Sequence, residues 1–225
     1  MILNTRPLAF DLDGTLIDSA PDLADSLDIL LSEINRKPLG LLAVKNLVGE
    51  GAVAMIEKGL KATGGLGKHD MHKLRARFLE IYYSRMTYKT KLFPGCIETL
   101  ELLKKTNHVL VLVTNKPEYM ALPILEKLNI KKYFANVSGG DTYSERKPSA
   151  KHLINTFKDI GIDHSNAILI GDSITDIKCA KNTNIPIILV SYGYLNQNID
   201  EVLADKIIDT LKELPKAIKS LNNIY

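Results

Sequence analysis

Short runs of apolar residues that end in polar ones recur along the chain and predict the strands of a buried sheet. The clear runs cover residues 8–10, 109–113, 167–170 and 187–190, and weaker ones lie near residues 134–137 and 206–208. Because consecutive positions in the clear runs are apolar, both faces of the sheet must be covered by other elements. The pattern therefore indicates a parallel sheet between two layers of helices.

Segments with apolar residues at helical spacing alternate with these strands. They cover residues 95–105, 117–128, 149–160 and 174–182. Pro117 and Pro148 stand where the first turn of a helix tolerates proline. The alternation predicts an α/β fold with a doubly wound parallel sheet, a Rossmann-like core whose ligands bind outside the carboxyl ends of the strands.

The region from about residue 21 to residue 90 breaks the alternation, because it contains helical patterns and no convincing strand. Its first helix has apolar residues along one face, with Ser19 as the expected N-cap. Further helices are expected over residues 41–47, 52–62 and 69–88. We therefore predict that a helical cap domain is inserted after the first strand. The cap would cover residues 18–90, the Rossmann-like core residues 1–17 and 91–225, and the hinges residues 16–20 and 88–94.

Composition and charge argue against several classes of protein. The 29 basic and 26 acidic residues are dispersed, so the net charge of +3 includes no run of like charges that would bind nucleic acid or a membrane surface. The N-terminus lacks the pattern of a signal peptide, and no apolar stretch approaches the ~18 residues of a membrane span. Cys96 and Cys179 stand apart, so we interpret them as buried helical residues rather than zinc ligands or a redox pair. We expect a cytoplasmic protein.

Polar residues that could carry chemistry follow three of the predicted strands. They are Asp11 and Asp13, Thr114 and Asn115, and Asp172. Since the carboxyl ends of parallel strands lie side by side, these residues should converge on one small site. Each of them alone could be only a helix cap or a turn residue. Their joint placement favours a functional site.

A cluster of carboxylates needs a compensating charge, because like charges raise each other's pKa values. A hard divalent cation supplies that charge, and a site with few oxygen ligands suits Mg²⁺, which commonly takes a phosphate oxygen as a further ligand. A lysine would complete a clamp for a phosphoryl group. Lys116 and Lys147 both precede a proline, and spacing alone does not choose between them. Asp176 follows Asp172 by four positions and could also belong to the site, or it could only stabilise the first turn of its helix.

These motifs resemble those of the haloacid dehalogenase-like hydrolases, in the expected order and over nearly the whole chain. The first is Phe10-Asp11-Leu12-Asp13-Gly14-Thr15-Leu16, and the fourth is Gly171-Asp172-Ser173-Ile174-Thr175-Asp176. Thr114 matches the second motif, and Lys147-Pro148 matches the third. The resemblance therefore favours Lys147 over Lys116.

The resemblance implies a catalytic role for four of these residues. Asp11 would be the nucleophile that forms an aspartyl-phosphate. Asp13 would act as general acid on the leaving group and then as general base on water. Thr114 and Lys147 would hold the phosphoryl oxygens.

The resemblance also implies a metal site. Mg²⁺ would bind the carboxylates of Asp11 and Asp172 and the backbone carbonyl of Asp13. Asp176 would orient a metal-bound water or Lys147 from behind. Gly14 would allow the backbone to approach the phosphate closely.

The residues after the first motif, Leu16-Ile17-Asp18-Ser19-Ala20-Pro21-Asp22-Leu23, are similar to those of phosphoglycolate phosphatases, and so is Val48-Gly49-Glu50-Gly51-Ala52 in the cap. Two departures exist. Glu50 stands where a small amide is expected, and Ser191-Tyr192-Gly193-Tyr194 matches the Gly-Tyr-rich loop of that group only in part. The resemblance implies 2-phosphoglycolate as the leading substrate. We expect the substrate to contact Gly14, Gly49, Glu50, Gly51, Thr114, Asn115 and Lys147.

Other functions use similar parts and remain alternatives. A phosphosugar mutase or an inorganic pyrophosphatase could be built on the same scaffold. A phosphoaspartate receiver domain also combines clustered Asp, Thr and Lys, but it needs only about a hundred residues and no helical insert over its site. We predict an enzyme that hydrolyses a small phosphorylated metabolite, and the sequence leaves monomer and homodimer equally open.

Overall fold

The computed structural model describes residues 5–45, 47–48, 51–195 and 203–222. Within these residues the main sheet has six strands in the order β5-β4-β1-β6-β7-β8, and every neighbouring pair is parallel. The strands are β1 (Leu8–Phe10), β4 (Leu110–Val113), β5 (Asn136–Ser138), β6 (Ile168–Gly171), β7 (Ile187–Val190) and β8 (Lys206–Ile208). The predicted doubly wound parallel sheet is confirmed.

The strand order explains where a site can form. The chain begins in the centre with β1, adds β4 and β5 on one side, and then adds β6, β7 and β8 on the other. The direction of winding therefore reverses at β1, and a crevice opens beside the carboxyl end of that strand. The residues that follow β1, β4 and β6 surround this crevice.

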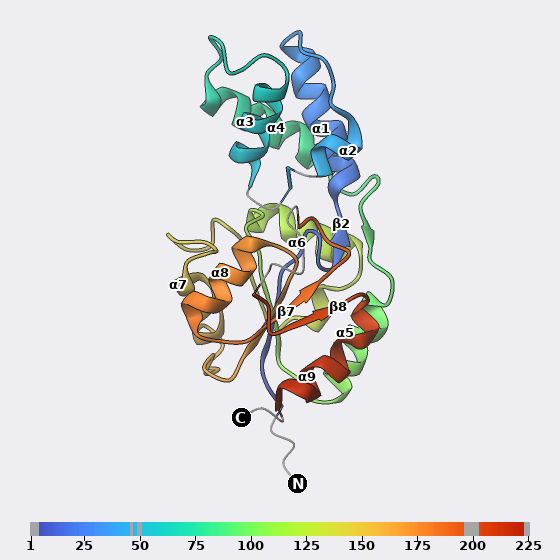
Figure 1. Ribbon diagram of the computed structural model, residues 1–225, viewed down its shortest axis with the longest axis vertical. Coiled ribbons are helices and arrows are strands. Elements are labelled where there is room, and N and C mark those ends of the chain that lie inside the picture. The colour runs from blue at the N-terminus through green and yellow to red at the C-terminus, as the bar shows by residue number, and fades with distance from the viewer. Residues whose placement is uncertain (1–4, 46, 49–50, 196–202, 223–225) are drawn as a thin grey trace.

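Helices cover both faces of the sheet, as the apolar strands require (Figure 1). They are α5 (Cys96–Lys105), α6 (Glu118–Lys127) and α9 (Leu214–Asn222) on one face, and α7 (Ala150–Lys158) and α8 (Ile174–Thr183) on the other. Two short 3-10 helices, η1 (Lys131–Tyr133) and η3 (Leu211–Glu213), lie in the connections.

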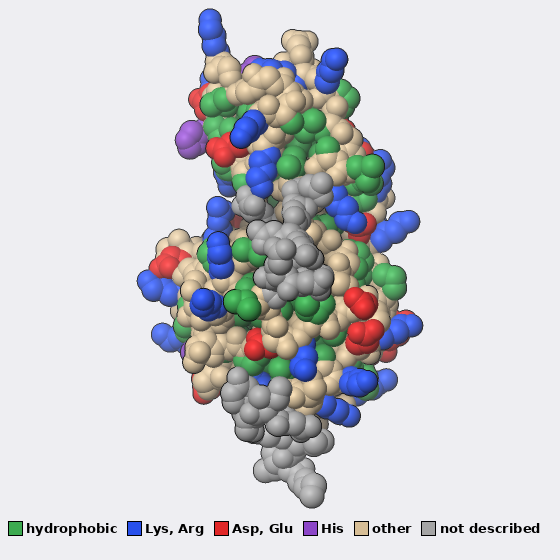
Figure 2. Space-filling view, viewed as in Figure 1, with side chains coloured by type: hydrophobic (Ala, Val, Ile, Leu, Met, Phe, Trp, Pro, Cys, Tyr) green, Lys and Arg blue, Asp and Glu red, His purple; other side chains and the backbone are tan. Residues whose placement is uncertain are grey.

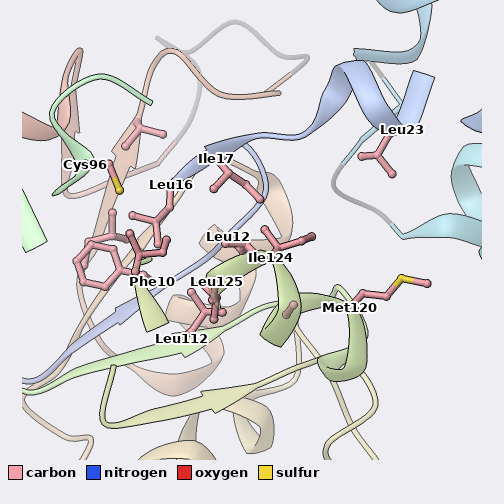
Figure 3. Packing of buried hydrophobic residues seen from close by; sticks show 14 of the residues in the cluster. Phe10, Leu12, Leu16, Ile17, Leu23, Cys96, Leu112, Met120, Ile124 and Leu125 are labelled. Atoms are coloured by element: carbon pink, nitrogen blue, oxygen red, sulfur yellow. The ribbon is translucent and has the colours of Figure 1, made fainter. Parts of the chain in front are cut away.

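Alternate residues of the strands pack into the two helical layers. Phe10 of β1 packs with the first layer, whereas its neighbour Ala9 packs with Leu153 of α7 and Cys179 of α8. Figure 3 shows the first layer, in which Phe10, Leu112 and Leu125 lie together and the chain continues through Leu16 and Ile17 toward Leu23. The period of two along each strand therefore divides the apolar residues between two separate cores.

The sequence located these elements with small errors at their ends. The helix expected over residues 149–160 is α7 (Ala150–Lys158), so Pro148 lies before the helix rather than in its first turn. Pro117 is the N-cap of α6. Cys96 and Cys179 are buried on α5 and α8, which confirms their interpretation as buried helical residues.

Four helices form a separate bundle above the carboxyl end of the sheet (Figure 1). They are α1 (Ala20–Glu33), α2 (Gly40–Lys45), α3 (Ala52–Ala62) and α4 (Met71–Arg85). The two strands β2 (Ile17–Asp18) and β3 (Lys91–Leu92) pair antiparallel where the chain leaves and re-enters the core. The sequence did not predict this pair, because two residues are too short to show a strand pattern.

Buried hydrogen bonds hold the two connections together. The carboxylate of Asp22, at the start of α1, accepts from the backbone N–H groups of Lys89 and Thr90 and from the Thr90 hydroxyl at 2.7–3.0 Å. On the same strand-to-helix segment the hydroxyl of Tyr194 accepts from the N–H groups of Ser19 and Ala20. Both connections are therefore fixed by polar groups that water cannot easily replace.

The N-cap predicted at Ser19 is confirmed in its position but not in its hydrogen bonding. Ser19 does occupy the N-cap position of α1, but its side chain makes no cap hydrogen bond. Its hydroxyl instead donates to Asp13. That bond uses the hydroxyl hydrogen, whereas a cap accepts through the hydroxyl oxygen. Pro21 in the first turn of α1 has no N–H to donate to that oxygen.

Charged side chains are scattered over the visible face of both lobes (Figure 2). None of the helices in the described part of the chain is long and apolar enough to cross a membrane.

Candidate active site

The turn after β1 directs two carboxylates into a cavity between the sheet and the helical bundle. Asp11 and Asp13 both line this cavity, whereas Leu12 between them is fully buried in the core. The carbonyl of Leu12 accepts from the N–H groups of Leu16 and Ile17, at 2.9 and 3.1 Å, which closes the turn. Burial of one apolar side chain thus fixes the direction of the two acidic ones.

Lys147 is held between two carboxylates in the floor of the site. Its Nζ lies 2.7 Å from Oδ1 of Asp11 and 2.7 Å from Oδ1 of Asp176. The lysine is 3% exposed and Asp176 is fully buried, so both ion pairs are shielded from water. Burial opposes the charge of Lys147, but Asp11 and Asp176 outweigh it and raise its pKa, which keeps the ammonium protonated.

The pKa values of Asp11 and Asp172 are raised because both carboxylates are buried close together. Burial raises the pKa of Asp11 to about 6, against the opposite effect of Lys147. Burial, and then the charges of Asp11 and Asp176, raise the pKa of Asp172 well above its ordinary value. An excess of negative charge therefore remains after Lys147 has been counted.

Two glycines make room for Asp172. A Cβ on Gly14 would meet the Asp172 carboxylate, and so would a Cβ on Gly193. Gly14 also has a φ of 87°, which other residues rarely adopt. The carboxylate accepts from the Thr15 hydroxyl at 3.1 Å and from the Tyr194 N–H at 2.7 Å. Gly14 is absent from the described lining of the cavity, so its observed contact is with Asp172.

Asp11, Asp172 and Asp176 form the one described cluster whose oxygen atoms, within 4.8 Å of one another, could hold a metal ion. Asp176 is already occupied, because Oδ1 accepts from Lys147 and Oδ2 from the N–H groups of Asp172 and Ser173 and from the Ser173 hydroxyl. It also forms a capping box with Ser173 at the start of α8. Asp176 therefore does both things that were considered for it: it stabilises the first turn of α8 and it holds Lys147 in place. Asp11 and Asp172 are left with the unbalanced charge, and this donor set fits a hard divalent cation.

Lys116 forms a second ion pair that the sequence did not assign. Its Nζ lies 2.8 Å from both carboxylate oxygens of Asp13 and 2.8 Å from the hydroxyl of Tyr82 on α4. The two lysines that spacing could not separate are thus both in the site, Lys147 beside Asp11 and Lys116 beside Asp13. The position of Lys116 just after a strand end was a usable signal. Nothing in an amphipathic helix pattern distinguishes Tyr82 from a core residue.

Thr114 and Asn115 reach the same cavity from the end of β4. The Thr114 Oγ1 accepts from the Lys116 N–H at 3.2 Å, and the Asn115 amide donates to the Lys147 carbonyl at 2.9 Å. Within the described residues Oδ1 of Asn115 is buried without a partner. The β4 loop therefore ties the two lysine-bearing loops to each other.

His152 supports the loop that carries Lys147, and the sequence did not single it out. It is fully buried, and its Nδ1 accepts from the Lys147 N–H at 3.2 Å. Burial, with a further contribution from Lys147, lowers the pKa of His152 to about 4. The imidazole is therefore neutral and can accept this hydrogen bond at neutral pH.

The helical bundle supplies an apolar wall opposite the carboxylates. Its residues in the cavity lining are Leu23, Leu47, Val48, Gly51, Ala52, Met55, Phe78, Leu79 and Tyr82. Of the three cap residues predicted to contact substrate, Gly51 lines the cavity and has a φ of 94°. Gly49 and Glu50 lie outside the described residues.

Comparisons with known proteins agree with this geometry. The family model for haloacid dehalogenase-like hydrolases matches residues 8–190. The phosphoglycolate phosphatase of Agrobacterium fabrum is 38% identical over 96% of this chain and 95% of that protein. The phosphoglycolate phosphatase of Caulobacter vibrioides is 36% identical over 97% of this chain and 93% of that protein. The chain therefore belongs to the haloacid dehalogenase-like hydrolase family.

A solved structure shows the same arrangement over nearly the whole chain. The crystal structure of a predicted phosphoglycolate phosphatase from Haemophilus somnus has a TM-score of 0.88 and 28% sequence identity. The match covers 96% of this chain and 99% of the other. The helical bundle and the sheet are thus shared with a relative within the family.

Proposed function

We propose that this hydrolase cleaves a small phosphate monoester, with 2-phosphoglycolate as its substrate and glycolate as the product. The observation that carries the proposal is the convergence of Asp11, Asp13 and Lys147 on one cavity under an apolar roof. The relatives named as phosphoglycolate phosphatases, which match nearly the full length of the chain, support the choice of substrate.

The geometry suits a two-step transfer through Asp11. A carboxylate oxygen of Asp11 attacks phosphorus, the P–O bond to the leaving group breaks, and an aspartyl-phosphate forms. Asp13 lies beside it in the cavity wall and gives a proton to the leaving oxygen. Water then attacks phosphorus and gives a proton to Asp13, the bond between Asp11 and phosphorus breaks, and inorganic phosphate leaves with the Asp11 carboxylate restored.

Other side chains would hold the phosphoryl group during this transfer. The Thr114 hydroxyl already accepts from Lys116, so its own hydrogen is available to a phosphoryl oxygen. Lys147 supplies a charge next to Asp11, which offsets the negative charge that gathers there. Asn115 and Gly51 line the same cavity and would contact the substrate.

We further propose that the cation is Mg²⁺. Asp11, Asp172 and the backbone carbonyl of Asp13 would hold it, and Asp176 would keep Lys147 and the Asp172 loop in place. Support comes from the raised pKa values of Asp11 and Asp172, which burial causes first and neighbouring carboxylates increase, so that a cation there would stabilise both ionised groups. When bound, the ion would withdraw charge from the phosphoryl oxygens.

We propose that residues 18–90 act as a cap that closes over the substrate. The support is the position of the helical bundle above the carboxyl end of the sheet and the antiparallel β2 and β3 at its base (Figure 1). Closure would exclude water from the aspartyl-phosphate until the leaving group has gone.

A panel of phosphate esters with and without Mg²⁺ tests the function. We expect the highest kcat/KM for 2-phosphoglycolate and loss of turnover in EDTA. Asp11→Asn should lower kcat by about 10⁴-fold or more, because it removes the nucleophile. Asp70→Asn is a matched control, since Asp70 is an exposed N-cap of α4 and asparagine caps a helix equally well.

Two results would contradict this function. Full activity of Asp11→Asn would exclude the proposed nucleophile. Conversion of β-glucose 1-phosphate into an isomer, without release of phosphate, would instead identify a phosphosugar mutase.

A further inference from the structure

The contact between Lys116 and Tyr82 joins the core to the cap at the wall of the cavity. Lys116 lies in the loop between β4 and α6, and Tyr82 is a buried residue of α4. Their Nζ and hydroxyl atoms are 2.8 Å apart, and Nζ also lies 4.7 Å from the centre of the tyrosine ring. Both residues line the cavity that contains Asp11 and Asp13.

The cavity has few groups that could receive a negatively charged leaving group. Among the described residues of its lining, the cations are Lys116 and Lys147. Lys147 is already shared by Asp11 and Asp176 on the nucleophile side. The cap contributes mainly aliphatic and aromatic side chains. A carboxylate placed against such a wall without a cation would lose its hydration and gain no compensating interaction.

Lys116 is also on the correct side of the reaction. Asp13 protonates the oxygen that leaves phosphorus, and Lys116 Nζ is 2.8 Å from both oxygens of Asp13. In 2-phosphoglycolate a single methylene separates the leaving oxygen from the carboxylate. A substrate whose leaving oxygen contacts Asp13 therefore brings its carboxylate within reach of Lys116.

We propose that Lys116 and Tyr82 together bind the carboxylate of the leaving group, and so select 2-phosphoglycolate over esters of the same length without a carboxylate. This inference rests on the proposed phosphatase function and names the groups that give it specificity. The core supplies the ammonium and the cap supplies the phenol. The proposed carboxylate-binding site is complete only where α4 lies against the loop after β4.

The donors of the pair match the acceptors of a carboxylate. The ammonium of Lys116 has three N–H groups. Two of them now donate to Asp13 and one donates to the Tyr82 hydroxyl. A substrate carboxylate can replace one of the contacts to Asp13. The Tyr82 hydroxyl accepts from Lys116, and no described residue accepts its own hydrogen. Burial raises the pKa of Tyr82 to about 12, so the phenol keeps that hydrogen and can donate it to the same carboxylate.

A matched pair of substrates separates this role from simple support of Asp13. Ethyl phosphate has the chain length of 2-phosphoglycolate and lacks its carboxylate. The measured quantity is the ratio of kcat/KM for 2-phosphoglycolate to kcat/KM for ethyl phosphate, with Mg²⁺ present. We expect Lys116→Met to lower this ratio about 10- to 100-fold and Tyr82→Phe to lower it about 5- to 10-fold, as for loss of hydrogen bonds to a charged group.

The variants include a control and a safeguard against misfolding. Tyr83→Phe changes the next residue of α4, whose half-exposed ring lies against Tyr119 and outside the cavity lining, and should leave the ratio unchanged. Tyr82→Phe removes one oxygen atom and keeps the ring stacked on Phe78. It therefore tests the proposal even if Lys116→Met does not fold, which circular dichroism would show.

Each outcome supports or overturns the proposal. A fall in the ratio in both variants, mainly through KM for 2-phosphoglycolate, supports it. Equal losses on both substrates would reduce Lys116 to a residue that only positions Asp13, and would overturn it while the proposed function stands. A wild-type enzyme that turns over ethyl phosphate as well as 2-phosphoglycolate would overturn the proposed substrate and this inference together.

Discussion

At the scale of single residues, the two aspartates of the first motif are held by different lysines. Asp11 pairs with Lys147 at 2.7 Å and Asp13 with Lys116 at 2.8 Å. Asp11 is 8% exposed and belongs to the cluster of three carboxylates. Asp13 is half-buried and accepts a hydrogen bond from the Ser19 hydroxyl. Two carboxylates two positions apart thus have separate surroundings, as separate roles in proton transfer and nucleophilic attack require.

Replacement of the proposed proton donor should depend on the leaving group. We expect Asp13→Asn to lower kcat/KM for 2-phosphoglycolate by about 10²- to 10⁴-fold, because an alkoxide leaves poorly without a proton. The loss for p-nitrophenyl phosphate should be much smaller in the first step, because nitrophenolate is a stable anion. Burst kinetics with both substrates would measure the first step, and equal losses in it would contradict the role of Asp13.

At the scale of elements, Asp22 fastens both chain connections between the sheet and the helical bundle. It is fully buried in the first turn of α1, and it accepts four hydrogen bonds from Lys89 and Thr90 on the returning chain. Tyr194 makes a second connection, since its N–H donates to Asp172 and its hydroxyl donates to Asp18 of β2. Tyr194 therefore connects the cluster of three carboxylates directly to the segment that leads into the helical bundle.

Loss of the Asp22 acceptors should destabilise the protein. In Asp22→Asn an amide N–H₂ faces backbone N–H groups, which leaves buried donors unpaired at a cost of about 2 kcal/mol or more. For a chain of this size we expect Tm to fall by about 4 °C or more. Asp25→Asn on the same helix is the control, because its ion pairs with Arg85 and Lys89 are partly exposed and contribute about 1 kcal/mol or less. A Tm change in Asp22→Asn no larger than in this control would contradict the fastening role.

At the scale of the whole molecule, binding of a cation and pH should act together on stability. The folded pKa of Asp11 is about 6, above its ordinary value of 3.8, and that of Asp172 is raised as well. A carboxyl group whose pKa is raised on folding binds more protons in the folded state. Its contribution is therefore greatest below about pH 4 and is lost as the pH rises through 6. A bound cation should restore the lost stability at neutral pH.

We therefore expect Mg²⁺ to raise Tm more at pH 7.5 than at pH 5.5, where it must displace protons. Subtracting the Tm without Mg²⁺ at each pH removes the effect of other titrating groups, including His152, whose lowered pKa acts in the opposite direction. Differential scanning calorimetry measures both values. Asp172→Asn should abolish the increment, and an increment that is the same at both pH values would contradict the linkage.

Local patterns made much of the fold predictable. Continuous apolar runs such as 109–113 allow one interpretation, a strand buried on both faces, and the chain has enough of them to define a parallel sheet. The convergence of Asp11, Thr114 and Asp172 followed from the same rule, because residues at the ends of parallel strands must be neighbours. The short pair β2 and β3 carries no such repeat, and its position depends on a contact between residues more than seventy positions apart.

The sequence by itself determined the chemistry that is present, namely the acidic pair after β1, the later aspartate and two candidate lysines. Only the tertiary structure decided how these groups are paired. Lys147 reaches Asp11 across 136 positions, and Lys116 reaches Asp13 across 103 and Tyr82 across 34. The physical reason is that an ion pair depends on distance and burial in space. Periodicity reports which side of an element a residue occupies, but not which distant residue it meets there.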